Sequence, residues 1–417
     1  MPFSSVPNNN KAMTSTSNKS QLAIIFFTVF LYLVGFGVVI PIIPLLSKNF
    51  GATALQTGLL LSVYSLMQFL FSPFWGKLSD RMGRRPILLF CLFGEGLSYI
   101  MFAWARSLEM LFIARLLAGF FGASLSTASA YISDITPKNQ RSKGMALIGA
   151  AFGLGFVVGP ALGGLLAVWG NHINPAPHFD TSFAAYWVAA LCFANFLFGI
   201  KFLKESLSEK SESAAKKKRF SVMWHYLNIK TVGALMTVFL LSSLAMSGME
   251  ATLILFMGEK FQWTIKQVSF GFAYIGVIII FTQGFLVRRM LPKYGERQVL
   301  RIGLACFAVG LTTIAFSNTL LGMAIAMTLL SLGNGLSNPS ILGSISLLTD
   351  AKEQGAAMGV TQSMASLGRI LGPALGGALY GSVAITAPFW VSGGMAFVAL
   401  AIVLLNFKLI PDHARVG

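Results

Sequence analysis

The chain has 417 residues, of which 55% are hydrophobic and only 11% are charged, and its formal net charge is +17. Soluble domains contain about a quarter of charged residues, so this composition excludes an ordinary water-soluble globular protein. The basic excess could indicate a nucleic-acid partner, but the cations lie in short loops between apolar segments, and we expect no nucleic acid to bind.

Apolar segments of about twenty residues, the length that crosses a bilayer as a helix, recur along the chain. None alternates with the period of two that a membrane β-barrel requires. Helices also satisfy their own backbone groups in lipid. The sequence therefore predicts an all-α membrane protein of twelve transmembrane helices. In chain order they are 22–46, 56–76, 86–105, 109–133, 144–168, 183–203, 231–257, 268–290, 299–317, 320–347, 355–380 and 384–408.

The predicted helices fall into two groups of six. Residues 21–203 form the first six-helix bundle and residues 231–408 the second, joined by the polar linker 204–230. Residues 1–20 and 409–417 are tails. The first tail lacks the apolar core of a signal peptide, so we expect the first membrane helix to target the chain.

The cations indicate the orientation of the chain in the membrane. All but six of the 31 Lys and Arg residues lie in the tails, in the linker, or in loops on the same side as the tails. The positive-inside rule therefore predicts that both termini are cytoplasmic, with the basic loops facing anionic lipid headgroups. Compact loops and the missing signal peptide favour a bacterial inner membrane, and we expect a monomer.

The residue types that usually catalyse reactions or bind metals are not arranged in the sequence as in an active site. The cysteines Cys91, Cys192 and Cys306 lie far apart within apolar runs, as small core residues do. The four histidines show no metal-ligand spacing, and there is no Ser/His/Asp arrangement and no phosphate-binding motif. The sequence therefore predicts neither an enzyme nor an ATP-driven pump, and it predicts no metal and no cofactor.

The hexamer GPALGG occurs twice, at residues 159–164 and 372–377, and a glycine precedes each copy by four residues. Glycines at this spacing share one helix face and let two backbones approach closely, while the proline removes a donor and permits a bend. Helix packing explains one copy. An equivalent copy in the fifth helix of each bundle indicates two homologous halves about a central axis. The two sets are Gly155, Gly159, Pro160, Gly163 and Gly164, and Gly368, Gly372, Pro373, Gly376 and Gly377.

A short loop between the second and third helices reads GKLSDRMGRRP, from Gly76 to Pro86. It combines a glycine turn, one acid and four cations. Its counterpart after the eighth helix, RRMLPKYGERQ, keeps Gly295 and the cations but lacks an acid at the position of Asp80. This loop could be only a positive-inside stop signal, which would explain the cations but not the acid.

With these motifs in place, the chain resembles the major facilitator superfamily, and within it the drug:proton antiporter branch that includes tetracycline exporters. GKLSDRMGRR is similar to the family's loop 2–3 signature, RLLAGFFGAS from Arg115 to the helix-four signature, and GLGFVVGPALGG to the helix-five antiporter signature. The resemblance extends over all twelve predicted spans. It implies two bundles whose helices 1, 4, 7 and 10 line a central cavity, with the helix-five glycines near the interface between bundles.

The resemblance also implies a role for the loop. Asp80 would lie at the N-terminus of helix eleven, where the helix dipole attracts an anion. Arg84 would pair with Asp134 at the cytoplasmic end of helix four. Together these contacts would latch the cytoplasmic side in the outward-open state. The residues of this predicted latch are Gly76, Asp80, Arg81, Gly83, Arg84, Arg85 and Asp134.

Four charged residues lie inside predicted spans, where charges are costly and usually functional. They are Glu95, Arg115, Glu250 and Arg369. Arg115 matches the helix-four signature, and we expect it to tune a nearby proton site. Glu250 is expected to bind protons or substrate as access alternates, or else to form a structural ion pair with Arg369. Glu95 lies one turn from Ser98, which stands where tetracycline exporters have their helix-three acid, and it could replace that acid.

Further polar residues inside the spans predict a substrate cavity. Tyr64 and Gln68 are one turn apart in the second helix, and Asn334 and Asn338 lie in a glycine-rich stretch of the tenth. The predicted cavity comprises Tyr32, Tyr64, Gln68, Glu250, Asn334, Asn338 and Arg369. The alternative is that these side chains join helices to one another. Tyr32 also occupies the approximate place of the helix-one acid of tetracycline exporters, so the sequence does not specify tetracycline.

The sequence therefore predicts a secondary active transporter that exchanges protons for an amphipathic small molecule by alternating access. One alternative is a carrier of an organic anion or lipid-like metabolite, with Arg115 and Arg369 binding the negative group. Another is a transporter-derived sensor, although the linker is too short and polar to form a separate module.

Overall fold

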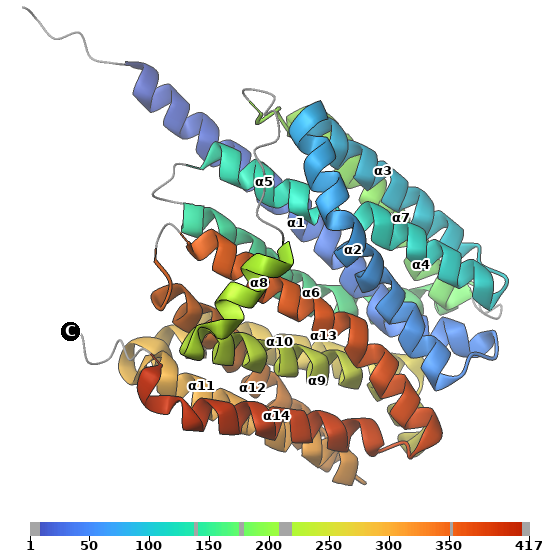
Figure 1. Ribbon diagram of the computed structural model, residues 1–417. Coiled ribbons are helices and arrows are strands. Elements are labelled where there is room, and N and C mark those ends of the chain that lie inside the picture. The colour runs from blue at the N-terminus through green and yellow to red at the C-terminus, as the bar shows by residue number, and fades with distance from the viewer. Residues whose placement is uncertain (1–8, 137–140, 175–178, 208–218, 351–352, 411–417) are drawn as a thin grey trace, which may run out of the picture.

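The computed structural model describes residues 9–136, 141–174, 179–207, 219–350 and 353–410. Figure 1 shows two groups of helices, with the blue-to-green first half above the yellow-to-red second half. The first half contains α1 (Asn9–Asn49), α2 (Ala54–Met82), α3 (Arg84–Ala103), α4 (Leu108–Gly122), α5 (Leu125–Ile135), α6 (Arg141–Ile173) and α7 (Phe179–Phe202). The second contains α9 (Lys230–Phe261), α10 (Ile265–Phe281), the π-helix η2 (Thr282–Leu286), α11 (Val287–Phe316), α12 (Leu320–Leu347), α13 (Gln354–Ser382) and α14 (Ala387–Leu405). The short 3₁₀ helix η3 (Phe407–Leu409) follows α14.

The predicted architecture of membrane helices in two bundles is confirmed. Within the described ranges, ten helical segments are long and apolar enough to span a membrane. One of them, Lys266–Phe316, covers two of the predicted spans. The two spans meet at Gly295, where the backbone leaves the helical conformation with φ 72° and ψ 163°. The remaining predicted span, 355–380, falls in the 29-residue α13, which packs against α2 and α9 and is not among these ten segments.

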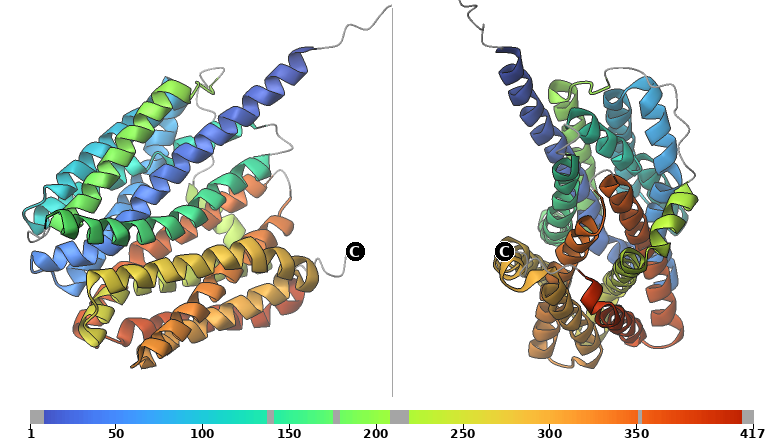
Figure 2. Two further views of the ribbon diagram at one scale, coloured as in Figure 1. Left: turned by 180° about the vertical axis from the view of Figure 1, so that it is seen from behind. Right: turned by 60° about the vertical axis from the view of Figure 1, so that its left-hand side comes forward.

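The structure differs from the predicted elements in three places. The predicted span 109–133 is two helices, α4 and α5, separated by Ala123 and Ser124. The helix α8 (Arg219–Asn228) forms within the predicted polar linker, because Tyr226 is buried against the core of the second half. The helix α1 begins at Asn9, inside the predicted tail, and its first turns project beyond the bundle (Figures 1 and 2).

The two glycine sets join equivalent pairs of helices, one pair in each half. A Cβ added at Gly159 would lie only 2.5 Å from the Cα of Gly37 on α1. A Cβ added at Gly376 would lie 2.5 Å from the carbonyl oxygen of Gly248 on α9. The sets therefore pack α6 on α1 and α13 on α9, which are side by side in both views of Figure 2. Most of their close contacts lie inside each half, but Pro373 and Gly377 of the second set also meet α2 of the first half, so that set lies at the boundary between the halves as well.

Contacts of α13 with α2 bring the two halves together. A side chain at Gly58 on α2 would collide with the carbonyl oxygen of Pro373 on α13, and one at Gly377 would collide with that of Ala54. They involve the first turns of α2 and the last turns of α13, and these helix ends lie away from the chain termini, on the right in Figure 1. At the same end Ala251 of α9 belongs to the core of the first half. The halves are therefore packed together at the end away from the termini.

Candidate functional site

The tyrosine–glutamine cluster, formed by Tyr32 of α1 and by Tyr64 and Gln68 of α2, lies at the middle of the first half. The Tyr32 and Tyr64 hydroxyls are 2.7 Å apart, and Gln68 Nε2 donates to the Tyr32 hydroxyl over 2.5 Å. Tyr32 and Gln68 both donate to the carbonyl oxygen of Gly122, at 2.9 and 3.1 Å. Because Tyr32 donates to Gly122, its hydroxyl accepts from Tyr64. Three residues that the sequence assigned to one cavity are thus directly connected.

The interruption between α4 and α5 supplies the acceptor for this cluster. The last carbonyl groups of a helix have no partners within it, and α4 ends at Gly122. A Cβ at Gly122 would lie 2.6 Å from the Tyr64 hydroxyl and 2.9 Å from that of Tyr32, so a larger residue would displace both tyrosines. Gly122 is therefore a site residue that the sequence-based list of cavity residues lacked.

Two opposite charges lie buried beside the cluster. Arg115 of α4 and Glu95 of α3 are each 1% exposed. The Arg115 guanidinium lies 4.4 Å from the centre of the Tyr64 ring, a cation–π contact, and its Nε donates to the carbonyl of Leu60 over 3.3 Å. Glu95 interacts electrostatically with Arg115 and with Tyr64. Within the described chain, Glu95 Oε1 and Arg115 Nη1 have no hydrogen-bonding partner. The attraction between the two opposite charges is therefore what offsets the cost of burying them.

Tyr99 is a further member of this buried group that the sequence-based list lacked. It lies one turn after Glu95 on α3, is 1% exposed and interacts electrostatically with both Glu95 and Arg115. Its hydroxyl has no hydrogen-bonding partner among the residues that the structure describes. The spacing of four residues from Glu95 is the one signal that could have identified it.

The second half presents its charges differently. Glu250 of α9 and Arg369 of α13 are both partly exposed and interact electrostatically with each other. Arg369 donates from Nη2 to the Ser366 hydroxyl over 3.2 Å. The two charges of the second half are thus less enclosed than Glu95 and Arg115 of the first.

Asn334 and Asn338 contact each other on α12. Asn338 Nδ2 donates to Asn334 Oδ1 over 3.0 Å, and both side chains are partly exposed. The neighbouring Ser337 donates instead to the carbonyl of Gly333, on the side of α12 that packs on α11. The asparagine pair is thus a connected polar feature of the second half, and its role as cavity lining stays a prediction.

Opposite charges also pair where α2 meets α3. Arg84 Nη1 lies 2.6 Å from Asp80 Oδ1, and Arg84 Nε lies 3.0 Å from Asp134 Oδ2. The Arg84 guanidinium also donates to the Ser79 hydroxyl over 2.7 Å. One arginine at the start of α3 thereby joins the ends of α2 and α5.

Glu205, directly after α7, is the residue of this loop cluster that the sequence-based latch omitted. Its carboxylate accepts from the backbone N–H groups of Arg84 and Arg85 at 2.8 and 3.1 Å, and it caps the N-terminus of α3. Gly83 has a φ of 106°, and a Cβ there would lie 2.6 Å from Glu205 Oε2. Of the other predicted latch residues, Gly76 accepts from Ser79 through its carbonyl, and Arg81 is exposed.

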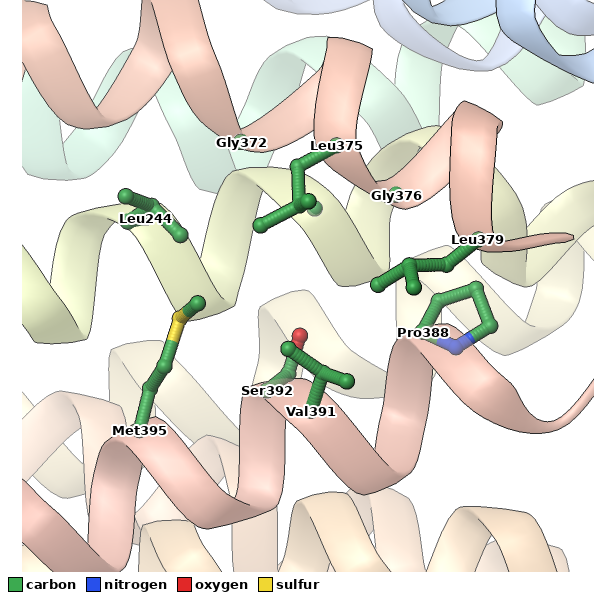
Figure 3. Close-up of a pocket in the computed structure, with 10 residues that line it drawn as sticks. Leu244, Gly372, Leu375, Gly376, Leu379, Pro388, Val391, Ser392 and Met395 are labelled. Carbon is green, nitrogen blue, oxygen red and sulfur yellow. The ribbon is translucent and has the colours of Figure 1, made fainter. Parts of the chain in front are cut away.

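Figure 3 shows a separate pocket between α9, α13 and α14 in the second half. Leu244, Leu375, Leu379 and Met395 contribute apolar side chains to it, beside Gly372 and Gly376. Its volume of about 10 Å³ is about what one water molecule needs. The pocket is a packing gap beside the glycines and is too small for the predicted substrate.

A sequence model described as Major Facilitator Superfamily matches residues 25–293 and 284–416. The chain belongs to the major facilitator superfamily. Members of this superfamily are transporters rather than enzymes, and the chain is an integral multi-pass membrane protein. The predicted resemblance is thereby confirmed.

Curated relatives in the superfamily include resistance proteins. The chain is 33% identical over 390 residues to the tetracycline resistance protein, class C, of Escherichia coli, covering 91% of this chain and 95% of that protein. It is 30% identical over 387 residues to the class B protein of Escherichia coli, covering 91% and 93%. It is 26% identical over 387 residues to the quinolone resistance protein NorA of Staphylococcus aureus, covering 93% and 96%.

Solved structures of the superfamily share the fold over nearly the whole chain. The human organic anion transporter MFSD10 (TETRAN) is 25% identical with a TM-score of 0.69, covering 93% of this chain and 99% of that one. The nucleoside transporter NupG has a TM-score of 0.71 at 14% identity, covering 93% and 99%, and it shows the likeness of fold alone.

Proposed function

We propose that this transporter exports an amphipathic small molecule in exchange for protons, as a monomer in a bacterial inner membrane with both termini in the cytoplasm. The observation that carries the proposal is the set of charges inside the spans: Glu95 and Arg115 lie buried beside the tyrosine–glutamine cluster, and Glu250 and Arg369 are partly exposed on α9 and α13. The named relatives, which confer resistance to tetracycline and quinolone, support export of a drug-like molecule.

Glu250 is the acid that we assign to proton exchange. It is partly exposed and lies next to Ala251, which packs into the first half, so it lies at the boundary between the halves. A group at this boundary can change the side from which it is reached as the halves rock. Glu95 is 1% exposed and held beside Arg115, and we assign it to positioning the arginine and the tyrosines.

The close packing of α2 on α13 supports alternating access. Gly58 and Gly377 join the halves at the end away from the termini, which is the outer end in the proposed topology. Opening this contact and closing the opposite end would expose the boundary residues to the other side. The loop cluster of Asp80, Arg84 and Asp134 lies within the first half at that opposite end. When that end closes in the outward-open state, Asp80 would meet the N-terminus of α13, as in the latch predicted from the sequence.

The test is substrate flux in proteoliposomes that contain an internal pH dye. With the native protein, addition of tetracycline or a quinolone should move protons across the proteoliposome membrane. Glu250→Gln should abolish this proton movement but retain exchange of labelled for unlabelled substrate, because only the titrating group is lost. Glu259→Gln, an exposed acid near the end of the same helix, is the matched control and should behave as the native protein. Flux that ignores an imposed pH gradient in the native protein would refute proton coupling.

A further inference from the structure

We propose that the interruption between α4 and α5 is a hinge, at which α5 turns relative to α4 as the two halves rock. The turn moves Asp134 on α5 relative to Arg115 on α4, and it thereby couples the loop cluster to the buried charges. This inference rests on the alternating access of the proposed function, but it concerns a movement inside the first half rather than between the halves.

The backbone is tightened where the two helices meet. The N–H of Ala123 bonds to the carbonyl of Phe120 over 3.4 Å, and that of Ser124 bonds to the carbonyl of Phe121 over 3.2 Å. Each bond therefore spans three residues instead of the four of an α-helix. A 3₁₀ stretch within a helix often marks a hinge. The segment 108–135 contains no proline, so contacts with other helices are what stabilise the interruption.

Two side chains of α2 bond to carbonyl groups at this interruption. Trp75 Nε1 donates to the carbonyl of Phe120 over 2.7 Å, and Gln68 Nε2 donates to that of Gly122 over 3.1 Å. The two residues are seven apart, which places them on the same face of α2. Because the last carbonyls of a helix lack partners within it, these donors from α2 replace the missing backbone bonds.

Two hydroxyl groups of α5 bond to the backbone of α2. The Ser126 hydroxyl lies 2.8 Å from the carbonyl oxygen of Ser72 and 3.1 Å from that of Ala123. The Thr127 hydroxyl donates to the carbonyl of Trp75 over 3.4 Å. Each hydroxyl carries one proton, so Ser126 can bond either to α2 or to the interruption itself. This exchange of acceptors lets α5 turn without leaving the hydroxyl unpaired.

The interruption lies between two charged groups of the same span. On the α4 side, the Arg115 guanidinium lies 4.4 Å from the centre of the Tyr64 ring, and the Tyr64 hydroxyl lies 2.7 Å from that of Tyr32. Tyr32 in turn donates to the carbonyl of Gly122. On the α5 side, Asp134 belongs to the loop cluster. A turn at Gly122 therefore changes the contacts that position Arg115 at the same time as it moves Asp134.

The test measures distances between pairs of spin labels on the full-length protein in lipid nanodiscs, with the three native cysteines replaced by alanine. The hinge pair joins Ser133 on α5 to Ile200 on α7. The frame pair joins Leu97 on α3 to the same Ile200, because α3 and α7 pack on each other within the first half. If the first half moves as one rigid body, neither distance changes when the halves rock.

Gly58→Phe opens the outer end, because its side chain would collide with the carbonyl oxygen of Pro373 while α2 lies against α13. The state pair, Leu55 on α2 and Val383 after α13, lengthens when this end opens. Ser133 lies about 12 Å beyond the interruption, so a turn of about 25° moves it by about 5 Å. We expect the hinge pair to change by about that distance in Gly58→Phe, while the frame pair keeps its native distance.

The outcomes separate the hinge from the proposed function. A lengthened state pair with an unchanged hinge pair would overturn the hinge and leave alternating access intact. A state pair that stays short in the folded variant would overturn rocking about this contact, and the hinge would fail with it.

A second measurement leaves the outer contact untouched. Trp75→Phe combined with Gln68→Leu removes both α2 donors, so the freed carbonyls take backbone partners and α5 straightens on α4. We expect the hinge pair to shift by about 5 Å in this double variant, and by less in Trp75→Phe alone. Trp390→Phe, an exposed tryptophan on α14, is the matched control and should keep the native distance. A native hinge-pair distance in the folded double variant would also overturn the hinge.

Discussion

The two halves have matching helix packing but treat charge in opposite ways. Glycine sets join α6 to α1 and α13 to α9 in the same manner. However, Glu95 and Arg115 are buried inside the first half, while Glu250 and Arg369 are partly exposed at the boundary between the halves. The shared backbone framework therefore carries a fixed charge pair in one half and an accessible pair in the other. We interpret the first as structural support and the second as the exchanging site.

The largest expected effect tests whether the packing is in fact equivalent. Gly159→Val and Gly376→Val should each lower the free energy of unfolding by about 3 kcal/mol or more, because each new side chain meets a backbone that it cannot displace. Thermal unfolding in detergent measures the effect. Gly359→Val on α13, where an added Cβ meets nothing within 4 Å, is the control. A loss in only one of the two variants would show that the halves are not packed alike.

The next largest effect tests the contrast in charge burial. Arg115→Met should destabilise the protein by about 3 kcal/mol, because it leaves Glu95 as an uncompensated buried acid. The double variant Glu95→Gln with Arg115→Met should recover most of that loss. Arg369→Met should cost less than about 1 kcal/mol, since its side chain is partly exposed. Denaturation by urea in detergent compares the three variants, and equal costs for Arg115 and Arg369 would contradict the contrast.

A smaller effect on stability, but a clear one on transport, is expected at the loop between α2 and α3. Asp80→Asn weakens the contact with Arg84 and should lower the transport rate by about tenfold at an unchanged protein level. Asp350→Asn, an exposed acid of the second half, should leave transport unchanged. Transport by Asp80→Asn at the native rate would favour the simpler explanation, in which the loop is only a stop signal.

The second-half counterpart of this loop has no acid at the position equivalent to Asp80. After Gly295, Arg297 donates from Nε and Nη2 to the carbonyl of Ile410, at 3.0 and 2.7 Å. The arginine there joins the start of the helix to the end of the described chain through a backbone carbonyl.

Much of the fold could be predicted because its signals are local. Apolar runs of membrane length identified the spans, and the repeated hexamer identified the matching fifth helices. The one-turn spacing of Tyr64 and Gln68 correctly placed them side by side. The charges inside the spans were likewise visible from hydropathy, since each interrupts an apolar run.

The remaining site residues depend on contacts between distant segments. Glu205 caps α3 from 121 residues further along the chain, and nothing in its local sequence indicates that contact. The carbonyl of Gly122 became an acceptor because α4 ends there, and a continuous apolar run concealed the interruption. Exposure also could not be predicted, so the sequence treated Arg115 and Arg369 alike as possible binding groups.

The smallest expected effect is at Tyr32, in the tyrosine–glutamine cluster. Tyr32→Phe removes the hydroxyl that accepts from Tyr64 and Gln68 and donates to Gly122, yet Gln68 still reaches the same carbonyl. We therefore expect a loss of only about 1 kcal/mol in stability. Transport should be more sensitive, with about a threefold lower rate of proton-coupled flux, because the cluster beside Arg115 loses the hydroxyl that joins α1 to α2.

Flux in pH-dye proteoliposomes separates this role from simple packing. Tyr274→Phe removes a hydroxyl that contacts Thr328 at an exposed position on α10, and it should leave both flux and stability unchanged. If Tyr32→Phe lowered stability but not flux, the hydroxyl would serve only to join α1 to α2. If it lowered coupled flux while substrate exchange persisted, the buried charges of the first half would be acting on the boundary through Tyr32. The two halves would then have different roles in transport, and their difference would not be one of sequence alone.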